Sequence, residues 1–184
     1  MFHHVVSFRR SLVLILCTIL FLETQADSDI CKICTCYSLT TSVNCANRNL
    51  QSIPQPIPTN VEYLRLGNNN IATIKEGAFT GLSNLKELVL GTNNIATIKE
   101  GAFTGLSNLN YLYLSYNKIS RIEKEIFQGL HNLEKLVLGA NNIATIKEGA
   151  FTGLSNLNYL YLSYNKISRI EKEMFQGLHN LEKL

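Results

Sequence analysis

Four cysteines near the start of the chain are the residues best suited to chemistry. Cys31, Cys34, Cys36 and Cys45 are spaced C-x2-C-x-C-x8-C, and no cysteine follows them. Thiolates at comparable spacing can bind zinc, whereas an even, clustered set can instead form disulfides that staple a small cap. Four cysteines allow three pairings, and the spacing alone does not choose among them.

The first 26 residues indicate which chemistry applies to these cysteines. Arg9 and Arg10 precede an apolar run of about 12 residues, and Thr24-Gln25-Ala26 forms a small-residue cleavage site, as in a secretory signal peptide. A membrane anchor is the alternative, but about 20 apolar residues are needed to span a bilayer. We expect cleavage after Ala26 and folding in an oxidising compartment, where disulfides are favoured over zinc because no histidine lies near the cysteines.

The other polar residues argue against an enzyme and against a metal site. The formal net charge of +3, which falls to +2 beyond the first 26 residues, is too small to indicate a nucleic-acid partner, and Asp27 and Asp29 are the only aspartates. His131 and His179 occupy equivalent positions of an internal repeat in which serine also occurs, so we expect them on the surface. We therefore predict no catalytic activity, no metal and no cofactor.

From residue 61 onward the chain repeats with a period of 24 residues. One unit reads L-x-x-L-x-L-x-x-N-x-I-x-x-I-x-x-x-x-F-x-G-L-x-N, and residues 88–135 recur almost unchanged as 136–183. A short L-x-L segment in every unit predicts a strand whose leucines face one way. Stacked in parallel, such strands bury their leucines in one continuous core, so the sequence predicts a solenoid.

Two further columns of the repeat have a structural interpretation. An asparagine follows each strand, where its amide can satisfy backbone groups that would otherwise be buried without partners. A phenylalanine recurs in fixed register on the convex side, which predicts a stack of rings. The asparagines are Asn69, Asn93, Asn117, Asn141 and Asn165, and the phenylalanines are Phe79, Phe103, Phe127, Phe151 and Phe175.

These columns resemble the typical extracellular leucine-rich repeat. The cysteine cluster followed by Asn49-Leu50-Gln51-Ser52-Ile53-Pro54 resembles the N-terminal cap of that family, which includes Toll-like receptors, Slit-type guidance proteins and variable lymphocyte receptors. The resemblance implies an α/β leucine-rich-repeat solenoid, a right-handed horseshoe with a parallel β-sheet on its concave face. It also implies that Cys31 pairs with Cys36 and Cys34 with Cys45.

The predicted organisation has three parts. Residues 1–26 are the signal peptide, residues 27–60 the cysteine-rich cap, and residues 61–184 the repeats, with five full units and the start of a sixth. No second cysteine cluster covers the last unit, so we expect a fragment, or a chain that folds poorly alone. We expect the protein to be extracellular, with any membrane attachment in a region after Leu184.

Period-2 alternation sends the residues beside each inward-facing leucine to the concave side of the sheet. We call this surface the concave face and predict that it binds the ligand. Seven of the chain's eight tyrosines lie on it. The predicted ligand-binding residues are Tyr63, Arg65, Glu87, Val89, Tyr111, Tyr113, Tyr116, Lys135, Val137, Tyr159, Tyr161 and Tyr164.

The tyrosines of the concave face fall into two clusters that are two strands apart. We expect them to form shelves separated by about 10 Å, with a low trough of Val137, Gly139 and Ala140 between them. Tyrosine combines a large, rigid contact area with a hydroxyl group and is common in binding surfaces. The alternative interpretation is that aromatic residues simply suit exposed strands.

The pattern favours a secreted or cell-surface recognition ectodomain that binds a protein or a glycan, and it does not favour a nucleic-acid partner. A structural or adhesive protein of the extracellular matrix is the alternative. Saturable binding to a soluble partner would indicate the first function. Salt-sensitive, polyvalent association with matrix polymers would indicate the second.

Overall fold

Each L-x-L segment of the repeat forms the short strand that its alternation predicts. The computed structural model describes residues 29–37, 40–170 and 172–184, and the expected signal peptide lies outside them. The central leucine of every repeat strand is fully buried. The strands are β3 (Tyr63–Arg65), β5 (Glu87–Val89), β7 (Tyr111–Tyr113), β9 (Lys135–Val137) and β11 (Tyr159–Tyr161).

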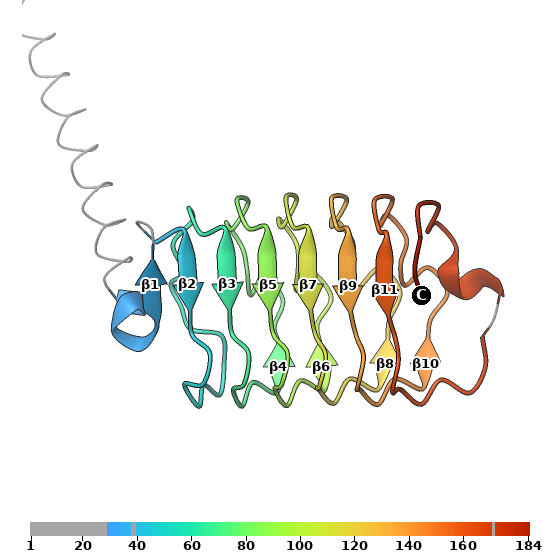
Figure 1. The fold of residues 1–184 in the computed structure, drawn as a ribbon, viewed down its shortest axis with the longest axis horizontal. Helices are drawn as coiled ribbons and strands as arrows, with labels where there is room; N and C mark the ends of the chain where they lie inside the picture. The colour runs from blue at the N-terminus through green and yellow to red at the C-terminus, as the bar shows by residue number, and fades with distance from the viewer. Residues whose placement is uncertain (1–28, 38–39, 171) are drawn as a thin grey trace, which may run out of the picture.

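These strands stack side by side along one side of the solenoid (Figure 1). They belong to a 7-stranded sheet with the order β1-β2-β3-β5-β7-β9-β11. The parallel pairs are in register, so Leu64 lies opposite Leu88, which lies opposite Leu112. Because the register does not slip, each column of the sequence repeat becomes a row of neighbouring side chains along the sheet.

The cysteine-rich segment covers the first repeat. A helical turn at residues 29–33 leads into β1 (Thr35–Tyr37), which pairs antiparallel with β2 (Ser42–Asn44). The disulfides are Cys31–Cys36 and Cys34–Cys45, with Cα–Cα distances of 5.6 and 4.5 Å, the pairing that the family resemblance implies. β2 also pairs in parallel with β3, so the sheet of the repeats begins within this segment.

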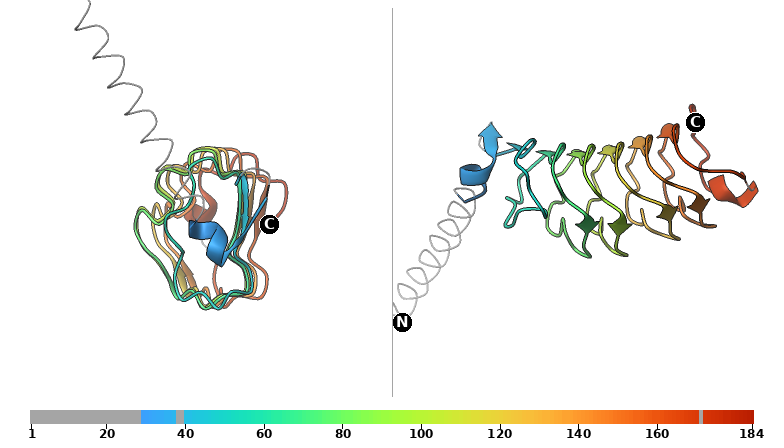
Figure 2. Two further views of the ribbon diagram at one scale, coloured as in Figure 1. Left: turned by 90° about the vertical axis from the view of Figure 1, so that its left-hand side faces the viewer. Right: turned by 90° about the horizontal axis from the view of Figure 1, so that it is seen from below.

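Short strands on the opposite side of the solenoid were not predicted from the repeat. β4 (Thr73–Ile74) pairs in parallel with β6 (Thr97–Ile98), and β8 (Arg121–Ile122) pairs in parallel with β10 (Thr145–Ile146). Figure 2 shows them across the core from the main sheet, and a 3-10 helix, η1 (Lys172–Phe175), follows them in the chain. They lie in the I-x-x-I part of the repeat, where Ile74, Ile98, Ile122 and Ile146 pack into or against the core, whereas Ile170 of the last unit is 69% exposed.

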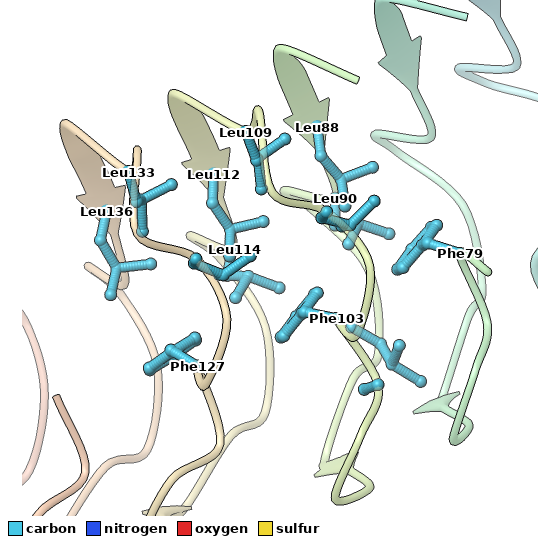
Figure 3. Packing of buried hydrophobic residues seen from close by; sticks show 14 of the residues in the cluster. Phe79, Leu88, Leu90, Phe103, Leu109, Leu112, Leu114, Phe127, Leu133 and Leu136 are labelled. Carbon is cyan, nitrogen blue, oxygen red and sulfur yellow. The ribbon is translucent and has the colours of Figure 1, made fainter. Parts of the chain in front are cut away.

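The recurring phenylalanines stack along the core, as the repeat predicts. Neighbouring rings from Phe79 to Phe175 have centroids 5.9 to 6.1 Å apart and lie in nearly parallel planes. Figure 3 shows Phe79, Phe103 and Phe127 packed beneath the leucines of the strands. The core is therefore a set of continuous columns, so a cavity in one unit weakens the packing of the units on either side.

The recurring asparagines satisfy backbone groups between units. Asn117 Nδ2 donates to the carbonyls of Leu90 and Leu114 at 3.0 and 3.1 Å, and its Oδ1 accepts the Ile95 N–H at 2.9 Å. Asn93 and Asn141 make the equivalent bonds, so each amide joins the turns of successive units. This is the structural role that the sequence predicts.

Candidate functional site

The strand register arranges the predicted ligand-binding residues in two rows. Each of these side chains is exposed or half-buried. Tyr116 and Tyr164 follow the carboxyl ends of β7 and β11. The first row is Tyr63, Glu87, Tyr111, Lys135 and Tyr159, and the second is Arg65, Val89, Tyr113, Val137 and Tyr161. The structure brings these residues to one surface, and their contact with a ligand stays a prediction.

Tyr116 and Tyr164 adopt a left-handed backbone conformation that the sequence analysis missed. Their φ angles are 56° and 59°, and the equivalent residues of the other units have the same conformation. A left-handed conformation costs an L-residue about 1–2 kcal/mol. The two side chains are 68% and 88% exposed, so packing against the protein does little to offset this cost. Because the conformation recurs in every unit whatever the residue type, it belongs to the turn after each strand, and the exposure of the two tyrosines is what distinguishes them.

Two tyrosine hydroxyls are held by glutamates of the following unit. Tyr111 donates to Glu134 Oε2 at 3.2 Å, and Tyr159 donates to Glu182 Oε2 at 3.0 Å. The charge of Glu134 raises the pKa of Tyr111, and the hydrogen bond to Glu182 raises the pKa of Tyr159. Both phenols therefore stay protonated at neutral pH, the opposite of what a nucleophilic tyrosine needs.

The expected trough between the tyrosine shelves is not open at Val137, because the side chain of Lys135 lies between the two rings there. Lys135 Nζ is 5.7 Å from the centroid of the Tyr113 ring and 5.4 Å from that of Tyr161. Both rings flank Val137 in the strand register, so the lysine stem crosses above it. The attraction of a cation for the ring faces accounts for this position.

The concave face is hollowed elsewhere, above β3, β5 and β7. The hollow has a volume of about 620 Å³. At its edge, Arg65 Nε lies 3.5 Å from Glu87 Oε1. Burial raises the pKa of Tyr113, which forms part of its wall, and the charge of Glu87 adds to this shift. The lining residues are Ala46, Arg65, Gly67, Asn68, Glu87, Val89, Gly91, Thr92, Tyr113, Ser115 and Tyr116.

The histidines do not form a site in the part of the chain that the structure describes. His131 is exposed, with Nδ1 at 3.3 Å from the Gly153 carbonyl oxygen, and His179 is exposed as well. No cluster of three or more histidine, cysteine, aspartate or glutamate residues that could hold a metal ion occurs within residues 29–37, 40–170 and 172–184. Over the same ranges no helix has the length and apolar character to cross a bilayer.

A solenoid that presents one exposed face of parallel strands, covered at one end by a disulfide-linked cap, defines a solenoid repeat protein. The comparison with known proteins agrees. The chain belongs to the leucine rich repeat family, whose pattern matches residues 43–95, 59–119, 83–143 and 131–184.

Several curated proteins are similar to part of the chain. Immunoglobulin superfamily member 10 of Mus musculus is 42% identical over 77 residues, which are 41% of this chain and 3% of that protein. Leucine-rich repeat-containing protein 4 of Rattus norvegicus is 36% identical over 75 residues, 40% of this chain and 12% of that protein. Epiphycan of Gallus gallus is 39% identical over 64 residues, 35% of this chain and 19% of that protein.

A solved structure extends the similarity over most of the repeats. The crystal structure of a TLR13-ssRNA13 complex matches with a TM-score of 0.74 and 36% identity, covering 82% of this chain and 21% of that chain. This supports the expected likeness to Toll-like receptor ectodomains. The chain spans only a small part of each of these relatives, from 3% to 21% of their length.

Proposed function

We propose that the chain is part of an extracellular recognition protein whose concave face binds a protein or glycan ligand. The observation that carries this proposal is the gathering of seven tyrosines on one face of the sheet, all of them exposed or half-buried. Two of the seven, Tyr116 and Tyr164, have left-handed backbones. Tyrosine rings presented on a rigid scaffold are the anchors that binding surfaces use most.

The contacts of the tyrosines support binding over a purely structural role. The hydroxyls of Tyr111 and Tyr159 are fixed by Glu134 and Glu182, so the rings are oriented before a ligand arrives. A surface ordered in advance loses less entropy on binding than a mobile one. The same residues do not close the core, since the leucines of the strands already fill it.

Two observations support an extracellular location. The cap carries two disulfides, which are typical of proteins that fold in an oxidising compartment. The predicted signal peptide over residues 1–26 would deliver the chain there. The proposal covers a secreted protein and a cell-surface ectodomain alike.

The test uses the chain as secreted protein, multimerised on beads, against an array of purified extracellular ectodomains and an array of glycans. We expect saturable binding to few array members. Changing Tyr111, Tyr113, Tyr159 and Tyr161 together to alanine should abolish it and leave the circular dichroism spectrum unchanged.

The matched control changes Lys75, Lys99 and Lys147 to alanine. These exposed lysines directly follow β4, β6 and β10 on the opposite side of the solenoid, so binding should be retained. Unchanged capture by the tyrosine variant would contradict the proposal. Polyvalent binding to sulfated matrix polymers that disappears with added salt would support the matrix function instead.

A further inference from the structure

Cations and rings alternate along the second half of the concave face. Lys135 Nζ lies between the rings of Tyr113 and Tyr161, and Lys183 Nζ lies 5.8 Å from the centroid of the Tyr161 ring. β7, β9 and β11 are neighbours in the sheet (Figure 1), and Lys183 continues the row beyond β11 through a parallel bridge to Tyr159. Tyr161 therefore has an ammonium group from the unit on each side.

Tyr113 has an ammonium group on its β9 side, that of Lys135, but the residue on its β5 side has the opposite charge. The position equivalent to Lys135 and Lys183 is Glu87, because Lys86-Glu87 reverses the order of Glu134-Lys135. The strand register places Glu87 and Lys135 on opposite sides of Tyr111 in the same row. On the β5 side of Tyr113, the repeat position that would supply the next ammonium group therefore supplies the Glu87 carboxylate instead.

That place coincides with the hollow of about 620 Å³. Glu87, Val89 and Tyr113 all line it, whereas Lys135 fills the equivalent space above Val137. The two spaces differ because a lysine stem reaches across a neighbouring ring, while Glu87 turns to Arg65 of the preceding strand. Val89 lies between Arg65 and Tyr113 in the register, whereas Val137 lies between Tyr113 and Tyr161, so a group above Val89 has one ring beside it in place of two.

Glu87 retains capacity for a further positive charge. Its contact with Arg65 joins only Nε and Oε1, at 3.5 Å, and the Arg65 side chain is 55% exposed. A carboxylate has about four acceptor positions, and the Glu87 side chain is 21% exposed, so part of this acceptor capacity faces the solvent. The face of an aromatic ring attracts a cation independently of that carboxylate.

We infer, on the basis of the proposed function, that this hollow receives a lysine or arginine side chain of a protein partner. The cation lies over the face of the Tyr113 ring that is turned away from Lys135, and it pairs with Glu87. The aliphatic stem lies on Val89. The partner's side chain thereby takes the position that Lys135 takes above Val137.

The test is an NMR titration of the isotope-labelled chain with two peptides that differ only in charge. Acetyl-Gly-Lys-Gly-amide should shift the Val89 methyl and Tyr113 ring signals in a saturable way. Acetyl-Gly-norleucine-Gly-amide, which has an uncharged side chain, should bind at least about fivefold more weakly. Equal affinity for the two peptides, or shifts confined to other residues, would overturn the inference.

Variants of the acidic residue separate a specific site from a general charge effect. Glu87→Lys installs the residue that the chain already carries at 135 and 183, so the fold should be kept and the peptide-induced shifts lost. Glu87→Gln should weaken binding about fivefold. Glu100→Gln removes an exposed carboxylate on the opposite side of the solenoid, just after β6, and should change affinity less than about twofold.

The outcomes also separate this inference from the proposed function. If Glu87→Lys binds the lysine peptide as well as the unmodified chain does, the inference fails even when array binding persists. If the variant with four tyrosines changed to alanine keeps its array ligands, while the lysine peptide binds at Tyr113 of the unmodified chain, the proposed function fails alone.

Discussion

At the scale of single residues, charge decides the shape of the concave face. Lys135 and Glu87 occupy the same position of the repeat, yet one fills the space beside Tyr113 and the other leaves it open. The two strands are placed alike in the sheet, since Leu88 and Leu136 are both fully buried and both strands pair in parallel with β7. Whether a space on this surface is filled therefore depends on the length of the nearby side chain and on which groups attract its charged terminus.

The pairing of Tyr111 with Glu134 predicts a pH effect. Glu134 raises the pKa of Tyr111 because a negative charge beside the phenol disfavours its ionised form. We expect Glu134→Gln to lower the pKa of Tyr111 toward about 10, the usual value, in a titration of the ring carbons by NMR. Tyr159, whose partner is Glu182, should be unaffected and serves as the internal control.

The sign of the linked stability effect follows from the raised pKa. The Tyr111–Glu134 interaction contributes its stability in full below the unfolded pKa of about 10, and that contribution is lost as pH rises through the folded pKa. Urea denaturation below pH 9 should therefore show no loss from this pair. A steep loss of stability below pH 9 that Glu134→Gln removes would contradict this assignment.

Asn117 allows a residue-scale test of the asparagine row. Asn117→Ala would leave two carbonyls and the Ile95 N–H without their side-chain partner in a buried place. We expect a loss of about 2–4 kcal/mol in the free energy of unfolding. Asn108→Ala removes one exposed hydrogen bond to the Ser83 carbonyl and should cost about 1 kcal/mol or less. Equal costs in urea denaturation would show that burial does not set the role of this row.

At the scale of elements, strands of three residues are too short to be stable alone. They persist because each pairs with the next and because their leucines share the core with the phenylalanine stack. The strength of an element therefore depends on its neighbours on both sides. The position of each ring within the phenylalanine stack should therefore determine how much it contributes to the free energy of unfolding.

The phenylalanine stack makes this dependence measurable. Phe127 is fully buried and stacks on Phe103 and Phe151, so Phe127→Ala should cost about 3–5 kcal/mol. Phe175 is half-buried and stacks on Phe151 alone among the described residues, so Phe175→Ala should cost clearly less. The free energies of unfolding of the two variants, measured in urea, test this difference. A larger loss from Phe175 would contradict the dependence on two neighbours.

The sequence predicted the elements better than it predicted the surface. Strands, asparagines and phenylalanines recur in every unit, so the constraint on each position was repeated and could be read from the chain. The position of Lys135 could not be read in this way, because a long side chain is placed by rings on two other strands. The difference between Glu87 and Lys135 at equivalent positions was visible in the sequence, but its consequence depends on the register that places the two residues on opposite sides of β7.

The left-handed residues were missed for a different reason. Such positions are recognised from glycine or asparagine, and this column contains Asn68, Thr92, Tyr116, Ala140 and Tyr164. The variety of residue types concealed a conformation that is the same in every unit. The structure shows that these five residues share one backbone conformation, which their residue types do not indicate.

At the scale of the whole molecule, the solenoid couples each unit mainly to the next. The hydrogen bonds of Asn93 and Asn117 span 22 to 27 residues, about one repeat length. A disturbance at one end should therefore weaken as it passes along the chain. The disulfide-linked cap is the natural place to introduce such a disturbance.

Removing the Cys34–Cys45 disulfide with serine substitutions should expose this gradient. Both sulfur-bearing residues are buried, and the Cys45 N–H donates to the Arg65 carbonyl at 2.7 Å, so the cap holds β3 directly. We expect a local loss of about 2–5 kcal/mol. Hydrogen exchange should accelerate at the amides of β2 and β3 and stay unchanged at β9 and β11.

Removing Cys31–Cys36, which joins half-buried residues 5 positions apart, should have a smaller effect and serves as the control. Equal acceleration from β2 to β11 would instead mean that the units unfold together, and the hollow at β3–β7 would then depend on the stability of the whole array rather than on its own end of it.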